Sequence, residues 1–304
     1  MTLRTLAPGK VNLSLFLGGG RADGRHELVT LFQPVSLADE VALVPAEGGG
    51  EDVVVCPGVE GVNLAARALA ELRARGWEAP PVRIDIAKGI PVAGGMAGGS
   101  ADAAATLRLA AAAGCPLGSE VLAEVARGLG ADVPSQLAPA PALGTGAGEV
   151  VTVVPERARH AFVILPSSER LSTPAVFAEA DRLGLARTEA ELRERRSALE
   201  TALWAGPELA PELLVNDLER AARSLCPLID EALACARELG ADAVLVCGSG
   251  PTVAGIFWGD DGPGRAMFAA ASARELFAGA AAAVPVDAGF ASVRDVGRQP
   301  RPAQ

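Results

Sequence analysis

The hydrophobic residues of the N-terminal part alternate with polar ones, which is the pattern of half-buried β-strands. Residues 11–17, VNLSLFL, alternate in this way, and so do residues 82–88, VRIDIAK. Residues 26–45 contain two further strand-like runs, which we expect to be separated at Pro34 and near Asp39. Together these segments predict an N-terminal β-sheet.

Other segments repeat their hydrophobic residues every three or four positions, as amphipathic helices do. The first begins at Asn63, which is a good N-cap, and stops at Gly76. The expected helices are 63–76, the alanine-rich run that starts at Ser100, 119–130, 172–184, a stretch after Asn216, and 228–240. Residues 243–257 predict a strand, a glycine turn and a second strand, and we expect residues 293–304 to form a loose tail.

The order of these elements indicates the architecture. Strands and helices mix without the regular β-α-β alternation of a doubly wound sheet or a TIM barrel, and they fall into two groups. Residues 155–159, between the groups, are largely polar. We therefore predict an α+β protein with two domains, residues 1–155 and 156–304.

Composition narrows the classes of function. The chain has 304 residues, of which 50% are hydrophobic and 21% are charged, so it is too apolar for a disordered protein. Its formal net charge of −10 argues against nucleic acid as a partner, because phosphate-backbone binding needs a basic face. The five cysteines form no Cys-x-x-Cys pair and there are only two histidines, which disfavours a zinc knuckle, a redox motif and a histidine-rich metal site.

The chain also lacks the sequence features of a membrane protein. A transmembrane helix needs about eighteen or more consecutive apolar residues, and no such run occurs. The N-terminal residues MTLRTLAPGK do not have the basic start and long apolar centre of a signal peptide. We expect a cytoplasmic protein with no membrane partner.

The glycine-rich segment 94–100, GGMAGGS, lies between an expected strand and an expected helix. Glycines let backbone N–H groups converge on one point, and a helix N-terminus adds unpaired N–H groups and a positive dipole end. The segment therefore predicts a cradle for an anion such as phosphate, and the alternative is a flexible or tightly packed loop. It is not a Walker A loop, because Ser100 and Ala101 follow its last glycine. The dinucleotide-binding fingerprint also fails, since Glu149 and Val253 replace its third glycine in the two nearest matches.

Residues 91–106, PVAGGMAGGSADAAAT, resemble the Pro-x-x-x-Gly-Leu-Gly-Ser-Ser-Ala signature of the GHMP kinases, which include galactokinase, homoserine kinase, mevalonate kinase and phosphomevalonate kinase. The chain resembles most closely the branch of this family that acts on 4-diphosphocytidyl-2-C-methyl-D-erythritol. Further blocks that resemble this branch follow in the same order between residues 7 and 257: APGKVNLSLFLGGGRADGRHELVTLFQPVSLADEV, GLGADVP, GTGAGE, LSTPAVF, NDLE and GSGPTVAG.

The resemblance implies a fold and a reaction. The N-terminal domain would resemble domain 2 of ribosomal protein S5, and the C-terminal domain would be ferredoxin-like. The reaction would transfer the γ-phosphoryl group of ATP to the 2-hydroxyl of 4-diphosphocytidyl-2-C-methyl-D-erythritol, in the methylerythritol phosphate route to isoprenoids. Magnesium would enter as the nucleotide complex, and the sequence identifies no protein ligand for it.

The resemblance also implies roles for particular residues. Asp132 would take the proton of the hydroxyl, and Lys10 would polarise the hydroxyl or the transferring phosphoryl group. The ATP-binding residues would be Pro91, Val92, Ala93, Gly94, Gly95, Met96, Ala97, Gly98, Gly99 and Ser100, with Asn63 and Lys88 near the adenine and phosphate ends. The substrate-binding residues would be Asn12 at the methylerythritol end, His26 hydrogen-bonded to the cytosine, Phe177 stacked on it, and Thr173 close to it.

Several alternatives stay open. Asn63 could be only a helix cap, Phe177 could be a core residue, and the turn 248–250 could be either part of the active site or a plain β-turn. Arg25 replaces the aromatic residue that usually precedes the histidine, although a guanidinium can also stack on a base. The chain could therefore phosphorylate another small alcohol, or could be a catalytically silent regulator on the same scaffold. It could be a monomer or a homodimer.

Overall fold

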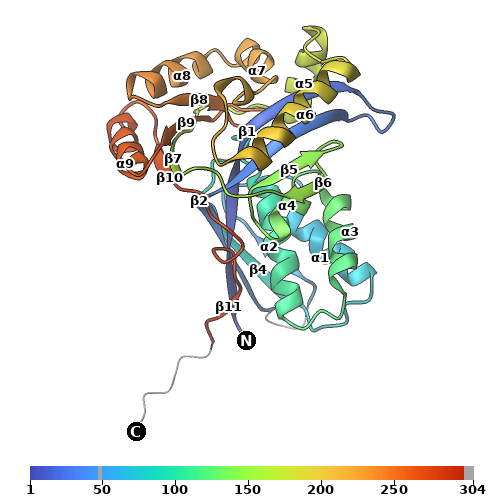
Figure 1. Ribbon diagram of the computed structural model, residues 1–304. Coiled ribbons are helices and arrows are strands. Elements are labelled where there is room, and N and C mark those ends of the chain that lie inside the picture. Colours follow the sequence, from blue (N-terminus) through green and yellow to red (C-terminus); the bar gives the residue numbers. More distant parts are fainter. Residues whose placement is uncertain (47–49, 298–304) are drawn as a thin grey trace.

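The computed structural model describes residues 1–46 and 50–297, and its strands form two sheets (Figure 1). The strands are β1 (Leu3–Gly20), β2 (His26–Pro45), β3 (Val53–Val55), β4 (Val82–Ala87), β5 (Ala142–Thr145), β6 (Val150–Val153), β7 (His160–Leu165), β8 (Ala243–Val246), β9 (Val253–Trp258), β10 (Ala281–Ala283) and β11 (Arg294–Asp295). The first sheet has the order β11-β1-β2-β4-β3, with β5 paired to β2 and β6 paired to β5. The second sheet has the order β10-β7-β9-β8.

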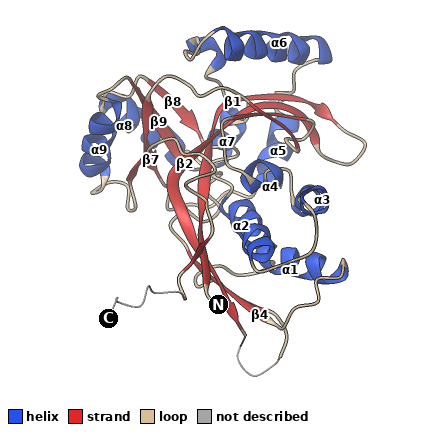
Figure 2. Ribbon diagram, turned by 60° about the horizontal axis from the view of Figure 1, so that its bottom comes forward, coloured by secondary structure: helices blue, strands red, loops and turns tan. Residues whose placement is uncertain are grey.

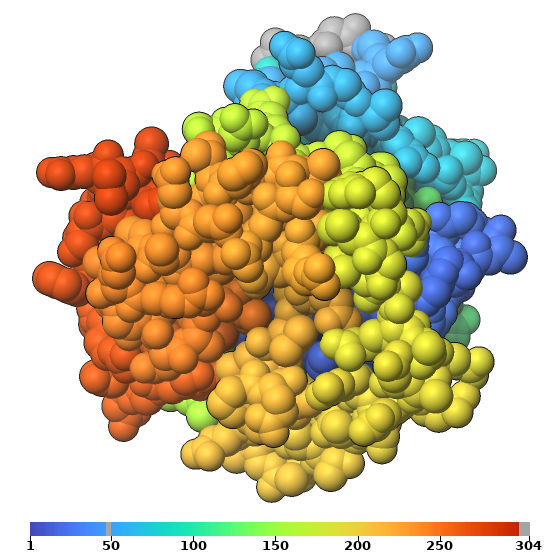
Figure 3. Space-filling view, turned by 90° about the horizontal axis from the view of Figure 1, so that it is seen from above, coloured from blue at the N-terminus to red at the C-terminus, as the bar shows by residue number. Residues whose placement is uncertain are grey.

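The helices cover these sheets (Figure 2). They are α1 (Leu64–Ala74), α2 (Gly98–Ala112), α3 (Ser119–Leu129), α4 (Val133–Leu137), α5 (Thr173–Arg182), α6 (Glu189–Ala205), α7 (Glu219–Leu225), α8 (Leu228–Glu238) and α9 (Gly262–Ala273), with a 3-10 turn at Pro211–Leu213. Helices α1 to α4 form a group beside the β1–β2 pair, and α8 and α9 pack on the second sheet. Seen from above, the blue tip of the β1–β2 pair emerges beside the yellow and yellow-green segments that contain α5 and α6 (Figure 3).

Strand β1 takes part in two hydrophobic cores. Leu13 and Phe16 belong to the core under the first sheet, whereas Leu15 and Leu17 pack with residues of the second sheet such as Phe257. Leu13 and Phe16 share a core despite their odd spacing because the pairing of β1 with β2 is irregular between Asn12 and Ser14, and such an irregularity reverses the side on which later residues point.

The break expected within residues 26–45 was wrong, because β2 is one continuous strand. Pro34 lies opposite Lys10, and the register shifts between Pro8, paired with Ala38, and Gly9, paired with Val35. The extra residues of β2 lie between Val35 and Ala38, so the irregularity in the ladder begins next to Pro34, and proline in a sheet is found near such irregularities. Pro34 therefore lies next to a distortion within β2 and does not end the strand.

The helices expected from periodicity are confirmed, with Asn63 as the N-cap of α1 and Ser172 as that of α5. Helix α2 begins at Gly98, two residues before the expected start.

The loose tail expected from residue 293 was wrong at Arg294 and Asp295, because these residues form β11, which pairs with β1. Residues 298–304 lie outside the described part of the chain. The strands change sheet between Val153 and His160, and the domain boundary near residue 155 stays a prediction. Across the described residues, no helix has the length and apolar character needed to cross a membrane.

Candidate active site

The predicted site residues meet around one cavity of about 640 Å³. It is bounded by β1, by the glycine-rich segment before α2, by the start of α4, by α5 and by the turn after β8. The predicted residues that line it are Lys10, Asn12, Asn63, Lys88, Pro91, Val92, Ala93, Gly94, Gly95, Met96, Ala97, Gly98, Gly99, Ser100, Asp132, Thr173 and Phe177. His26 is not among the lining residues, but its ring lies next to that of Phe177, with 5.1 Å between the ring centroids.

The glycine-rich segment leads directly into the N-terminus of α2. Ala97, the N-cap, has a left-handed backbone with φ 59°, and no side chain among the described residues caps the helix. The first N–H groups of an α-helix have no partner inside the helix, so those at the start of α2 remain available beside the cavity. This geometry suits an anion such as phosphate, as the sequence predicted.

The glycine-rich segment also packs tightly against the turn that follows β8. Gly95 has φ +79°, and a Cβ atom there would lie 1.8 Å from the carbonyl oxygen of Cys247. Gly248 faces the same contact from the other side, because its Cβ would lie 2.7 Å from the oxygen of Gly95. The two glycines thus let a segment of the first half and a turn of the second meet at the cavity, which Gly248 and Ser249 of that turn line. A role of the turn 248–250 in the active site stays a prediction.

Lys10 is held rigidly at the wall of the cavity. Its Nζ donates hydrogen bonds to Oδ1 of Asn12 at 2.7 Å and to the carbonyl oxygen of Gly95 at 3.0 Å. Asn12 in turn donates from Nδ2 to the hydroxyl oxygen of Thr30 at 2.7 Å. Because Lys10 is only 4% exposed, its positive charge is fixed in a poorly solvated place, where electrostatic interactions are strong.

Asp132 lies directly across from Lys10. It is the residue before α4, its side chain is 33% exposed, and its Oδ2 is 3.7 Å from Nζ of Lys10. A carboxylate that lines a cavity beside a fixed cation can accept a proton from a hydroxyl group bound there. The two residues predicted to be catalytic are therefore brought together.

Lys88 is balanced by two buried carboxylates that the sequence analysis did not identify. Its Nζ contacts Oδ2 of Asp39 and lies 2.8 Å from Oδ2 of Asp102. Burial alone would lower the pKa of Lys88, but the two carboxylates outweigh this effect and raise it. Burial raises the pKa of Asp102 to about 7, despite the opposing effect of Lys88. Lys88 lines the cavity, but its ammonium group is already paired with these two carboxylates.

Asn63 caps helix α1 and also lies at the cavity. Its Oδ1 accepts a hydrogen bond from the N–H of Ala65 at 2.8 Å, which caps α1, and the residue also lines the cavity. Its predicted contact with ATP stays a prediction.

The other end of the cavity carries the residues predicted to bind a base. Phe177 lies on α5, and Nε2 of His26 is 2.7 Å from Oδ1 of Asp181, one turn further along that helix. Thr173, at the start of α5, shares a hydrogen bond of 2.9 Å with Ser249. Arg25 does not line the cavity, and its guanidinium is paired with Asp23.

Sequence reasoning missed three further contributors. Thr30 and Phe32 of β2 line the cavity, and Asn216 donates from Nδ2 to the carbonyl oxygens of Val246 and Gly248 at 2.8 and 2.7 Å. The sequence singles out the NDLE block, which contains Asn216, only through its resemblance to the family. Its physical role, to hold the turn after β8, depends on a contact that sequence spacing does not show.

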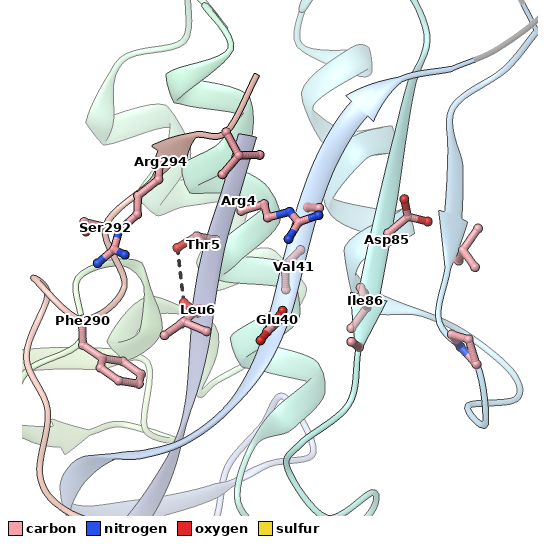
Figure 4. A pocket seen from close by; sticks show the side chains of 15 residues that line it. Arg4, Thr5, Leu6, Glu40, Val41, Asp85, Ile86, Phe290, Ser292 and Arg294 are labelled. Atoms are coloured by element: carbon pink, nitrogen blue, oxygen red, sulfur yellow. Dashed lines mark hydrogen bonds between the residues drawn. The ribbon is translucent and has the colours of Figure 1, made fainter. Parts of the chain in front are cut away.

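A second cavity, of about 480 Å³, lies on another part of the first sheet (Figure 4). It is lined by side chains of β1, β2, β4 and the C-terminal segment, among them Arg4, Leu6, Glu40, Asp85 and Arg294. None of the residues predicted for catalysis or binding lines it. The glycine-rich segment and the Lys10–Asp132 pair place the candidate site in the first cavity.

Two family models match the chain. The model described as the GHMP kinases N-terminal domain matches residues 63–140, and the model described as GHMP kinases C-terminal matches residues 198–275. Two relatives are named 4-diphosphocytidyl-2-C-methyl-D-erythritol kinase. The one from Streptomyces coelicolor is 45% identical over 262 residues, which cover 84% of this chain and 87% of the relative. The one from Kineococcus radiotolerans is 45% identical over 263 residues, which cover 82% and 79%.

Two solved structures superimpose on the chain. A crystal structure of 4-(cytidine 5'-diphospho)-2C-methyl-D-erythritol kinase superimposes with a TM-score of 0.74 and 34% identity, over 93% of this chain and 99% of that one. Homoserine kinase from Cytophaga hutchinsonii superimposes with a TM-score of 0.61 at 18% identity, over 96% of this chain and 97% of that one, which shows a shared fold.

Proposed function

Because the chain belongs to the GHMP kinase family, we propose that it transfers the γ-phosphoryl group of ATP to the 2-hydroxyl of 4-diphosphocytidyl-2-C-methyl-D-erythritol. The family resemblance and the α+β fold expected from the sequence are confirmed. The observation that carries the proposal is the pair formed by Lys10 and Asp132, 3.7 Å apart, on the same cavity as the glycine-rich segment.

The proposed reaction needs three functions from these residues. The segment from Gly94 to Ser100 and the N-terminus of α2 would hold the phosphates of ATP. Asp132 would accept the proton of the 2-hydroxyl group while the hydroxyl oxygen forms a bond to the γ-phosphorus of ATP. The bond between the γ-phosphorus and the oxygen that bridges it to the β-phosphate breaks at the same time, which releases ADP. Lys10 would stabilise the negative charge on the transferring group.

Magnesium belongs to the proposal as the complex with ATP. Among the described residues there is no group of three or more His, Cys, Asp or Glu side chains that could hold a metal ion. We therefore expect the phosphate oxygens of ATP to supply most ligands of the ion, and the hydroxyl of Ser100, in the first turn of α2, would be a further oxygen ligand from the glycine-rich segment. The ion would neutralise charge that develops on the phosphates.

The remaining predicted residues fit the alcohol substrate. Phe177 would stack on the cytosine, with His26 beside it, and Thr173 would lie close to the same group. Asn12 would reach the methylerythritol end, since its amide has a second N–H besides the one donated to Thr30. A cytoplasmic location is also part of this proposal.

An assay of ADP release tests the function. The cytidyl substrate, mevalonate and homoserine would be offered separately with ATP and magnesium, and we expect rapid ADP release only with the first. Release with one of the other alcohols would favour a different kinase of this family. Binding of the cytidyl substrate without ADP release from any alcohol would instead favour a catalytically silent regulator.

A further inference from the structure

Helix α5 contacts His26 through two side chains that lie one helical turn apart. Phe177 and Asp181 have the i, i+4 spacing that places them on one face of a helix. The Phe177 ring lies 5.1 Å from the His26 ring at an interplanar angle of 33°, and Oδ1 of Asp181 is 2.7 Å from Nε2 of His26. The side chain of His26 is only 10% exposed, whereas that of Asp181 is 56% exposed. His26 is thus held in one orientation by a helix from the other half of the chain.

This contact determines which ring nitrogen of His26 carries hydrogen. An ionised carboxylate only accepts hydrogen bonds, so Nε2 of His26 must be the donor to Asp181. In the neutral imidazole, Nδ1 then has a free lone pair and acts as an acceptor. No described residue forms a hydrogen bond with Nδ1 of His26.

The second histidine has the opposite arrangement. Nδ1 of His160 lies 2.6 Å from the carbonyl oxygen of Ala158, which also only accepts, so the hydrogen of neutral His160 is on Nδ1. The chain has only these two histidines. They therefore provide an internal comparison between the two tautomers.

We infer that Asp181 is a positioning residue that keeps Nδ1 of His26 as an acceptor, and that this selects cytosine over uracil. The inference rests on the proposed function, in which the substrate carries cytosine. The exocyclic N4 amino group of cytosine donates hydrogen bonds, whereas O4 of uracil accepts them. An acceptor at Nδ1 can pair with the first and leaves two lone pairs facing each other with the second.

The first test measures the tautomers directly. Nitrogen-15 spectra of the imidazole groups in the intact protein should show His26 with hydrogen on Nε2 and His160 with hydrogen on Nδ1. The substitution Asp181→Lys places a donor at Nε2, so His26 should change to the Nδ1-H form while His160 stays as it is. His26 with hydrogen on Nδ1 in the unaltered protein would overturn the inference.

The second test measures selection of the base. Binding of cytidine 5'-diphosphate and uridine 5'-diphosphate would be compared by calorimetry, with the ATP site saturated by a non-hydrolysable ATP analogue. We expect cytidine 5'-diphosphate to bind about 10-fold or more tightly than the uridine compound, because one hydrogen bond is exchanged for a repulsive contact. The ratio of the two affinities, cytidine 5'-diphosphate over uridine 5'-diphosphate, should fall toward one in Asp181→Ala and should fall further in Asp181→Lys.

A control separates this effect from simple loosening of α5. Glu179, on the same helix, accepts hydrogen bonds from Arg182 and Ser224 and makes none with His26. Glu179→Gln should therefore keep the cytidine preference. If Asp181→Ala and Asp181→Lys keep it too, Asp181 is only a structural anchor and the inference is wrong. Failure of every alcohol in the ADP assay, with the base preference intact, would overturn the proposed function and leave this inference standing.

Discussion

Nζ of Lys10 lies 3.7 Å from Oδ2 of Asp132, although the two residues come from β1 and from the start of α4. The lysine is fixed by Asn12 and by the carbonyl oxygen of Gly95, so its charge stays at one point of the cavity wall. A preorganised charge of this kind needs no rearrangement when negative charge develops nearby. The pair therefore offers both a proton acceptor and a stabilising cation on the cavity that the glycine-rich segment lines.

Asp132→Asn should lower kcat by about 100-fold or more, because asparagine keeps the shape of the side chain but cannot take the hydroxyl proton. The affinity for ATP, measured by calorimetry, should change little, since the phosphate segment is untouched. Steady-state ADP release gives kcat, and a denaturant titration checks that the variant is folded. Near-normal turnover by the folded variant would exclude Asp132 as the base.

Gly95→Ala should lower the free energy of unfolding by about 1–3 kcal/mol. The new Cβ would lie 1.8 Å from the carbonyl oxygen of Cys247, and the backbone at φ +79° is unfavourable for alanine. Gly99→Ala is the matched control, because its Cβ would meet only Leu64, at 3.9 Å. Urea titrations of both variants check this, and equal stabilities would mean that the segment does not need its close approach to the turn.

Asn216→Ala should destabilise the protein by about 2 kcal/mol, because the carbonyl groups of Val246 and Gly248 and the N–H of Leu218 lose a buried partner. Asn216→Asp should cost at least as much, since a carboxylate places an acceptor against those two carbonyl oxygens. Unfolding titrations measure both. An aspartate variant as stable as the unaltered protein would contradict the assigned hydrogen bonds.

Asp102→Asn tests the buried charge cluster through the pH dependence of stability. Burial raises the pKa of Asp102 from 3.8 to about 7, so between these values the folded state holds a proton that the unfolded state has released. The contribution of this group to stability is therefore full below about pH 4 and declines as the pH rises to about 7. Asparagine does not titrate, so the stability of the variant relative to the unaltered protein should rise across this range. A pH-independent difference, measured by urea titration at several pH values, would show that Asp102 is already ionised at low pH.

Phe177→Leu tests the stacking contact at the base end. Stacking of a base on an aromatic ring contributes about 1–3 kcal/mol, so the KM for the cytidyl substrate should rise about 10-fold, while the KM for ATP should stay nearly constant. Steady-state kinetics with each substrate varied in turn measure both constants. An unchanged KM for the cytidyl substrate would place Phe177 in the core only.

Local patterns predicted much of the fold. The periodicity of residues 63–76 and the cap Asn63 were enough for α1, because a helix end depends on neighbours in the chain. The glycine-rich segment and its position before α2 were predictable for the same reason, because the segment and the helix start are consecutive in the chain. The two-residue strand β11 and the continuity of β2 past Pro34 were not predicted, because both depend on pairing with β1.

What the sequence by itself determined was which residues are candidates for the chemistry, since Lys10, Asp132 and the glycine-rich segment belong to blocks that resemble those of the family. Only the tertiary structure decided how they cooperate. The match of Lys88 to two buried carboxylates and the hydrogen bond from His26 to Asp181 join residues from separate elements. Such contacts arise when sheets and helices pack, and no spacing along the chain encodes them.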